Sequence, residues 1–201
     1  MKIIMATGNK NKVREINEML EGTDINVISM KEACIDIDIE ENGKTFAENA
    51  IIKAEALRDV ANEIVMADDS GLEIDAMGGA PGIYSARFMG EDTSYDVKCN
   101  AILKELEGVP DEKRGARFIC SIAIAYPDGR PTKVFNGVFE GIIGREIIGE
   151  NGFGYDPIFF LPEYNMTSAQ ISPELKNSIS HRGKALEQAI VELKKCKNQL
   201  T

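Results

Sequence analysis

The chain has 201 residues, of which 43% are hydrophobic and 28% are charged, values that are ordinary for one soluble domain with a sizeable core. Its net charge of −10 argues against a general nucleic-acid-binding protein, because such proteins present a basic face. No apolar run approaches the roughly 20 residues that span a bilayer. The first residues also do not read as a signal peptide, so we expect no membrane association.

The four cysteines, Cys34, Cys99, Cys120 and Cys196, are scattered, without a C-x-x-C pair or a neighbouring histidine. We therefore expect reduced thiols in a cytoplasmic protein, and neither a zinc site nor a disulfide framework. The acidic charge still allows a small anionic ligand such as a triphosphate. An acidic protein that binds such a ligand needs a local basic cluster and a divalent cation.

Strand-like and helix-like patterns alternate from the start of the chain. They predict a buried strand over 2–6, a helix over 9–21 and a second strand over 25–29. Thr45 and Glu48 have the spacing of a capping box, which predicts that an amphipathic helix begins there and continues to about residue 61. The next strand, over 63–67, is predicted to end at the turn-forming residues 68–71.

The second half of the chain begins with a turn-rich loop over 78–82 and a helix over 93–106. Three consecutive antiparallel strands then follow over 117–126, 132–139 and 141–148. A glycine-rich loop over 149–156, a short strand over 158–161 and a helix over 180–197 complete the predicted elements. Because we find no repeat and no linker, we predict a single domain over 1–201 with a mixed α/β fold.

Residues 7–12, Thr-Gly-Asn-Lys-Asn-Lys, join the first predicted strand to the first helix. Backbone N–H groups and the positive end of the helix dipole make such a junction a natural phosphate site. The spacing is not that of a P-loop. The segment is also consistent with an ordinary asparagine helix cap and surface lysines.

Asp68 and Asp69 follow the strand predicted over 63–67. Adjacent carboxylates repel one another unless a cation relieves them, and hard oxygen ligands favour Mg²⁺ bridged to substrate phosphates. Glu40 and Glu41 could add a further carboxylate. The alternative is a turn in which the aspartates act only as caps.

Residues 152–157, Gly-Phe-Gly-Tyr-Asp-Pro, place glycines on both sides of an aromatic residue. Glycine lets the backbone approach a ligand closely, while Phe153 offers a flat face on which a purine could stack. Asp156 could accept a hydrogen bond from a base N–H. A turn with buried aromatic residues would have the same pattern.

Residues 180–183, Ser-His-Arg-Gly, open the last predicted helix. Cations at a helix N-terminus are disfavoured by roughly 0.3–1 kcal/mol, so their presence there would be explained by a ligand oxygen. A capped helix with an exposed His-Arg pair is the alternative. Lys53 and Lys176 are individually uninformative, and a solvated surface is the default for each.

These motifs, taken in order with their spacing, resemble the inosine/xanthosine triphosphate pyrophosphatase family over essentially the whole chain. The resemblance rests on segments 7–12, 40–46, 67–72, 78–85, 152–157 and 180–183. It implies a long central mixed sheet flanked by helices, with two lobes around a nucleotide cleft, and a homodimer. It also implies cleavage of ITP, dITP and XTP to the monophosphate and pyrophosphate.

The resemblance further implies residue roles and a Mg²⁺ cofactor. Asp69 would be the proton acceptor and a metal ligand, with one of Glu40 and Glu41 nearby. The implied phosphate contacts are Thr7, Gly8, Asn9, Lys10, Asn11, Lys12 and Lys53, with a further substrate contact from Ser70. The implied base contacts are Phe153, Gly154, Tyr155, Asp156, Lys176, His181 and Arg182.

We expect water to attack the α-phosphorus, with catalysis by positioning and electrostatic stabilisation. Arg182 and neighbouring donors would match a 6-oxo group and reject the 6-amino group of adenine. Two alternatives stay open. A pyrophosphatase for modified pyrimidine nucleotides would carry an S-x-S-P-R-R entry motif, in whose place segment 7–12 stands. A non-catalytic nucleotide-binding module would not need the acidic residues.

Overall fold

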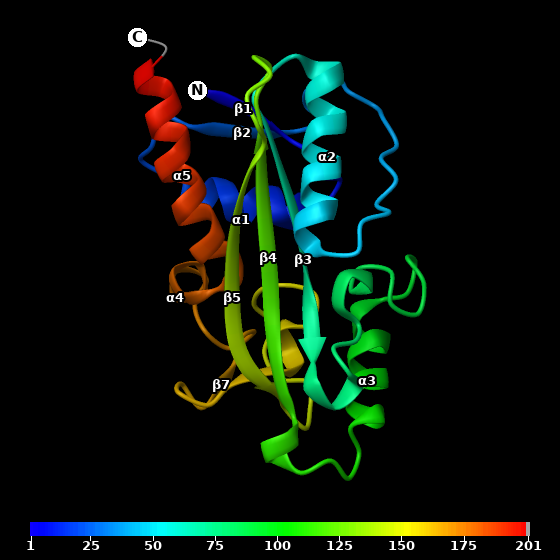
Figure 1. The fold of residues 1–201 in the computed structure, drawn as a ribbon. Coiled ribbons are helices and arrows are strands. Elements are labelled where there is room, and N and C mark those ends of the chain that lie inside the picture. The colour runs from blue at the N-terminus through cyan, green and yellow to red at the C-terminus, as the bar shows by residue number, and fades with distance from the viewer. Residues whose placement is uncertain (200–201) are drawn as a thin grey trace. The chain divides into compact units, whose positions relative to one another are not determined.

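The computed structural model describes residues 1–199, and within them seven strands form one sheet in the order β2-β1-β3-β4-β5-β6-β7 (Figure 1). β1 is parallel to β2 and β3, whereas β6 is antiparallel to β5 and β7. The strands are β1 Lys2–Met5, β2 Asn26–Ser29, β3 Val65–Ile74, β4 Gly115–Ala125, β5 Lys133–Ile143, β6 Phe159–Leu161 and β7 Met166–Thr167. The α-helices are α1 Lys10–Met19, α2 Phe46–Ala61, α3 Tyr95–Glu105, α4 Pro173–Ile179 and α5 His181–Gln199. The predicted mixed sheet flanked by helices is confirmed.

The chain forms two compact units. Unit 1 comprises Met1–Asp69, Cys120–Gly137 and the described residues from Arg182 onward, and unit 2 comprises Ser70–Ile119 and Val138–His181. β3, β4 and β5 each contribute residues to both units. Because both units are built from segments distant in sequence, neither is a continuous stretch of chain. The single domain remains a prediction.

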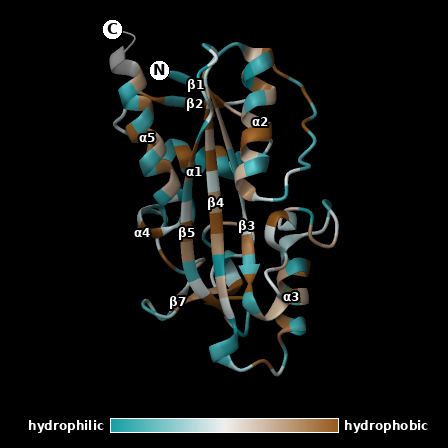
Figure 2. Cartoon of the chain, viewed as in Figure 1, coloured by the Kyte–Doolittle hydropathy of each residue, from teal (hydrophilic) through white to brown (hydrophobic). Residues whose placement is uncertain are grey.

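In unit 1 the strands bury side chains on both faces, and successive residues alternate between two apolar clusters. Ile3 and Met5 pack with residues of α1 and α5, whereas Ile4 and Ala6 pack with residues of α2. The same alternation continues in β3 and β4. The α1/α5 side also contains Met66, Cys120, Ile122 and Ile124, and the α2 side contains Val65, Ala67, Ala123 and Ala125. Hydrophilic and hydrophobic residues alternate along α2 and α5, as expected of helices with one buried side (Figure 2).

The core of unit 2 is built on α3 and on the parts of the strands that belong to this unit. Its buried residues include Leu72, Ile74, Ile102, Phe118, Phe139, Ile143 and Phe159. The rings of Phe118 and Phe159 lie 4.6 Å apart between centroids, and those of Phe139 and Phe159 lie 5.3 Å apart. Within the described part of the chain, no helix is long and apolar enough to cross a membrane.

Three sequence-based predictions of elements were wrong. β3 does not end at residue 67 but continues through residues 68–71 to Ile74, because pairing and burial in the sheet override the weak strand preference of Asp, Ser and Gly. The strands predicted over 132–139 and 141–148 are one strand, β5, that ends at Ile143. Gly141, the first residue of the strand predicted over 141–148, lies inside β5 at a close-packing position, since a Cβ there would lie 2.7 Å from the Phe159 ring. Helix α4 was missed, although Ser172 caps it and Pro173 is its first residue.

Candidate functional site

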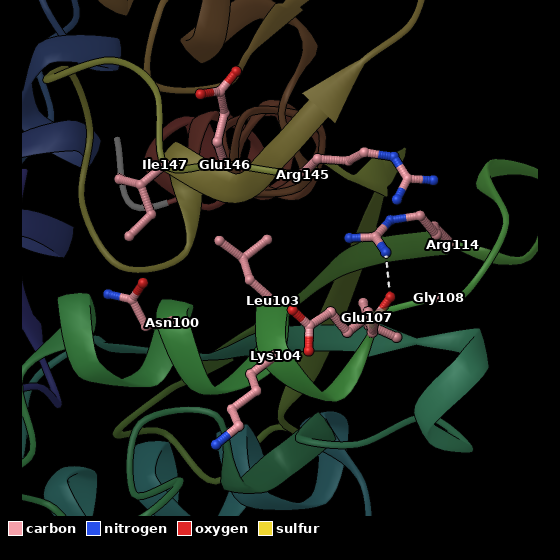
Figure 3. A pocket seen from close by; sticks show the side chains of 10 residues that line it. Asn100, Leu103, Lys104, Glu107, Gly108, Arg114, Arg145, Glu146 and Ile147 are labelled. Carbon is pink, nitrogen blue, oxygen red and sulfur yellow. Dashed lines mark hydrogen bonds between the residues drawn. The ribbon is translucent and has the colours of Figure 1, made fainter.

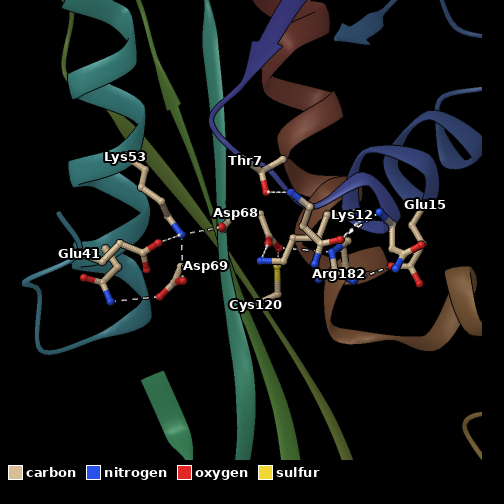
Figure 4. A network of polar contacts seen from close by, with 12 residues as sticks. Thr7, Lys12, Glu15, Glu41, Lys53, Asp68, Asp69, Cys120 and Arg182 are labelled. Carbon is tan, nitrogen blue, oxygen red and sulfur yellow. Dashed lines mark hydrogen bonds and ion pairs between the residues drawn. The ribbon is translucent and has the colours of Figure 1, made fainter. Parts of the chain in front are cut away.

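Asp68 and Asp69 lie on opposite faces of the sheet because β3 runs through them as an extended strand. Asp68 follows Met66 on the face of α1 and α5, and Asp69 follows Ala67 on the face of α2. Figure 4 shows the two carboxylates on either side of β3, each among its own partners. The expectation that the two aspartates follow the end of the strand is therefore wrong, and so is the alternative of a turn that they cap.

Asp68 is held by cations from two helices of unit 1. Lys12 of α1 forms an ion pair with Asp68 Oδ1, and Arg182 Nε of α5 lies 3.3 Å from Asp68 Oδ2. The Cys120 thiol donates to the same oxygen at 3.0 Å. Arg182 Nη1 also pairs with Glu15 Oε2 at 2.5 Å. Arg182 therefore has carboxylate partners at the start of α5, and the alternative of an exposed His-Arg pair is wrong because both side chains are buried.

The electrostatic consequence for Asp68 is a carboxylate that stays ionised. Burial alone would raise its pKa, but Lys12 and Arg182 hold the pKa far below its ordinary 3.8. A lowered folded-state pKa stabilises the fold at pH values above about 4, and this contribution is lost as the pH falls further. Asp68 is thus a structural centre of unit 1.

Asp69 faces a different group on α2. Lys53 Nζ lies 2.9 Å from Asp69 Oδ1, 3.0 Å from the Asp68 carbonyl oxygen and 3.3 Å from Glu41 Oε1. Burial raises the pKa of Asp69, and Glu41 adds to this effect, although Lys53 opposes it. Conversely, burial lowers the pKa of Lys53 but the carboxylates of Asp69 and Glu41 outweigh it, so its pKa is raised. A carboxylate with a raised pKa, beside a retained cation, is suited to accept a proton.

Glu40 and Glu41 are distinguished by their positions. Glu41 is half-buried and pairs with Lys53, whereas Glu40 is exposed. Within the described residues, no three His, Cys, Asp or Glu side chains gather closely enough to hold a metal ion by themselves. Two carboxylates, Asp69 and Glu41, share the Lys53 ammonium. Such a donor set fits Mg²⁺, which proteins commonly hold through one or two carboxylates together with substrate phosphates.

The start of α1 borders a cavity of about 610 Å³ in unit 1. Asn9 caps the helix, since its Oδ1 accepts from the N–H groups of Asn11 at 2.9 Å and Lys12 at 3.4 Å. Thr7 Oγ1 accepts from the Asn9 N–H at 3.1 Å. The cavity is lined by Thr7, Gly8, Asn9, Lys10, Val13, Arg14, Ser29, Lys31 and Glu32. The predicted asparagine cap of this helix is confirmed. Three of the lining residues are cations, which suits an anionic ligand, and phosphate binding at this cavity stays a prediction.

In unit 2, Asp156 organises the glycine-rich loop. Its Oδ2 accepts from the Phe153 N–H at 2.8 Å and pairs with Lys176 Nζ at 2.6 Å. Lys176 Nζ in turn lies 5.2 Å from the centre of the Phe153 ring. The carboxylate therefore fixes both the aromatic face and the cation beside it.

Tyr155 and His181 are buried in unit 2. The Tyr155 hydroxyl donates to the Ser85 carbonyl oxygen at 2.8 Å, and its ring packs edge-on against Tyr95. His181 stacks on Phe118 with ring centres 4.9 Å apart. Ser70 is half-buried and begins unit 2, directly after Asp69. The contacts of Tyr155 are those of a core residue that anchors the loop.

Sequence reasoning missed two buried polar residues at this site. Glu15 stands three residues after Lys12 on α1, and Asn49 stands four residues before Lys53 on α2. Residues three or four positions apart lie on the same face of a helix. Inspection of the positions three and four residues away from the two predicted lysines would therefore have identified both residues.

A second cavity, of about 450 Å³ in unit 2, contains none of the predicted site residues (Figure 3). Buried Arg114 lines it and donates to the carbonyl oxygens of Leu106 and Ile143, both at 2.7 Å, and of Gly144. It thereby ties the end of α3 to the end of β5, which is a structural role.

Known proteins resemble this chain along nearly its whole length. The sequence pattern of the Ham1 family matches residues 3–192. A dITP/XTP pyrophosphatase of Desulforamulus reducens is 52% identical over 193 residues, which cover 94% of each chain. The solved Ham1 protein of Staphylococcus aureus is 42% identical, with a TM-score of 0.86 over 97% of this chain and 99% of its own. A HAM1 protein from Coxiella burnetii is 41% identical, with a TM-score of 0.87 and the same coverage.

Proposed function

Because this chain belongs to the Ham1 family, we propose that it is a nucleoside triphosphate pyrophosphatase that converts ITP, dITP and XTP to the monophosphate and pyrophosphate. The family membership confirms the resemblance inferred from the motifs. The observation that carries the proposal is that Lys53 pairs with both Asp69 and Glu41 on one face of β3. A buried carboxylate with a raised pKa, a lysine and a second carboxylate are the groups that hydrolysis of a phosphoanhydride needs.

The proposed reaction is attack of water on the α-phosphorus. Asp69 takes a proton from the water as the new P–O bond forms, and the bond from the α-phosphorus to the bridging oxygen breaks. Pyrophosphate leaves with its negative charge stabilised by lysines, for which Lys53 and Lys10 are the candidates. Asp69 and Glu41 would hold Mg²⁺, which when bound would neutralise charge on the phosphates.

We propose that the base binds to the glycine-rich loop of unit 2, which Asp156 organises. Phe153 offers the stacking face, and Lys176 offers a donor that Asp156 holds in place. Asp156 acts in this assignment by positioning its neighbours, and Tyr155 by anchoring the loop. His181 and Arg182 stay candidates for reading the 6-oxo group.

Arg182→Ala should reduce the preference for ITP over ATP by about 10–100-fold, because a donor matched to the 6-oxo group is lost. The substitution also removes the guanidinium that pairs with both Glu15 and Asp68, so the protein should melt at a lower temperature. The ratio of kcat/KM for the two substrates is independent of the folded fraction and is therefore the quantity to measure. An unchanged ratio would show that Arg182 does not contribute to the selection of ITP over ATP.

Gly152→Ala should raise KM for ITP by about tenfold with a smaller change in kcat. Gly152 has φ +73°, and a Cβ there would lie 2.1 Å from Asp156 Oδ2 and 3.0 Å from Lys176 Nζ. The loop would have to move, and Phe153 and Lys176 with it. Gly129→Ala is the matched control, since Gly129 has φ +78° but open space around its Cβ. Equal effects of the two substitutions on KM would show that backbone strain alone is responsible.

A pyrophosphate-release assay tests the proposed function. ITP, dITP and XTP should be cleaved in the presence of Mg²⁺, and GTP and ATP much more slowly. Chelation of Mg²⁺ should abolish release. Cleavage of modified pyrimidine triphosphates instead, or binding of ITP without any release of pyrophosphate, would each contradict the proposal.

The location and the assembly state are also proposals. All four cysteines are free, which is compatible with the reducing cytoplasm that we propose. The homodimer implied by the family resemblance is measurable as the molar mass of the purified protein by light scattering. We propose small-molecule triphosphates as the partners, and neither nucleic acid nor a membrane.

A further inference from the structure

Asn49 of α2 is fully buried and contacts both parts of the acidic site. Its Oδ1 accepts a hydrogen bond from the Gly43 N–H at 2.8 Å, and its Nδ2 donates to Asp69 Oδ2 at 3.3 Å. We propose that Asn49 is a positioning residue for the reaction: it orients the Asp69 carboxylate and holds the loop that carries Glu41 beside it. This inference rests on the function proposed above.

The geometry of α2 allows Asn49 and Lys53 to contact the same carboxylate, that of Asp69. They stand four residues apart, so both side chains lie on the face of the helix that packs toward β3. Lys53 contacts Asp69 Oδ1 and Asn49 contacts Asp69 Oδ2. Because each oxygen has its own donor, rotation of the carboxylate would break both hydrogen bonds.

The two hydrogen bonds of Asn49 require a side chain that both accepts and donates, as an amide does. The Gly43 N–H requires an acceptor, and the Asp69 carboxylate requires a donor. An aspartate at position 49 would satisfy Gly43 but would place a second anionic oxygen against Asp69. A leucine would satisfy neither group and would leave both polar groups buried without this partner.

The loop also depends on glycine for its approach to Asn49. A Cβ at position 43 would lie 2.6 Å from Asn49 Oδ1 and 2.8 Å from Glu48 Cβ. Glycine therefore allows the backbone two residues after Glu41 to reach the amide. The capping box at the start of α2 secures the same loop, since Lys44 N–H donates to Glu48 Oε2 at 2.6 Å.

The test compares kcat with KM in two variants. Asn49→Asp keeps the acceptor for Gly43 and removes the donor to Asp69, whereas Asn49→Leu removes both without adding charge. We expect kcat for ITP to fall about 10–100-fold in both variants, as is typical when a hydrogen bond to a charged group is lost. In Asn49→Leu, KM and the Kd for a non-hydrolysable α,β-imido analogue of ITP, measured by calorimetry, should stay within about threefold.

Leu57→Ala on the same helix is the control for destabilisation, because Leu57 is equally buried but packs only in the apolar cluster. It should lower the melting temperature and leave kcat of the folded protein unchanged. If the Asn49 variants behave like this control, the positioning role is overturned. A rise of Kd in proportion to the loss of kcat would overturn it as well. These results are read against wild-type protein that cleaves ITP, since an inactive wild type would refute the proposed function itself.

Discussion

Asp69→Asn should lower kcat for ITP by at least about 10³-fold while the protein remains folded, because the proposed proton acceptor and one metal ligand are lost together. Asparagine has the same shape and can still contact Lys53. Steady-state pyrophosphate release at saturating ITP and Mg²⁺ measures the effect.

Thermal unfolding of Asp69→Asn gives an independent check. The pKa of Asp69 is raised in the folded protein, mainly by burial, so its ionised form disfavours folding at neutral pH. Asparagine removes this cost, and Lys53 retains Glu41 as a partner. The melting temperature should therefore be unchanged or slightly higher. Near wild-type turnover in this variant would refute the assignment of Asp69.

Asp68→Asn should have the opposite effect, with a large loss of stability. The variant leaves Lys12 and Arg182 without a buried carboxylate that they share, and breaking such a pair typically costs about 3–5 kcal/mol. For a protein of this length, that loss corresponds to a decrease in melting temperature of roughly 6–20 °C. Circular dichroism during heating measures it.

The turnover of Asp68→Asn at a temperature where it is folded should exceed that of Asp69→Asn by at least about tenfold, since the proton acceptor is intact. We thus expect substitution of Asp68 to affect mainly stability and substitution of Asp69 to affect mainly catalysis. If folded Asp68→Asn were inactive and Asp69→Asn active, the structural role assigned to Asp68 and the catalytic role assigned to Asp69 would have to be exchanged.

The residue types of the site were predictable because they follow from chemistry that local sequence displays. Segment 7–12 joins a strand to a helix in the structure as predicted, and Thr45 caps α2 as its spacing with Glu48 indicated. The ordered motifs were sufficient to infer the family, which the comparisons confirm. These features depend on residues within a few positions of one another.

The partners of those residues were not predictable, because they come from distant parts of the chain. Asp68 meets Arg182, which is 114 positions away, and Glu15 meets the same arginine from 167 positions away. The choice between Glu40 and Glu41 depends on how a loop lies against Lys53. Burial of Tyr155 likewise depends on contacts with Ser85 and Tyr95.

The sequence by itself determined the mixed α/β class, the order of the motifs and the presence of acids, lysines and an aromatic loop suited to a nucleotide. Only the tertiary structure decided that residues 68–71 are strand and not turn. Because of that difference, the Asp68 side chain lies in a buried network of ion pairs, whereas the Asp69 side chain lies on the opposite face, where we propose that the reaction takes place. The physical reason is that side chains alternate between faces only where the backbone is extended, and the backbone here is extended because it is paired within a sheet whose other strands lie elsewhere in the sequence.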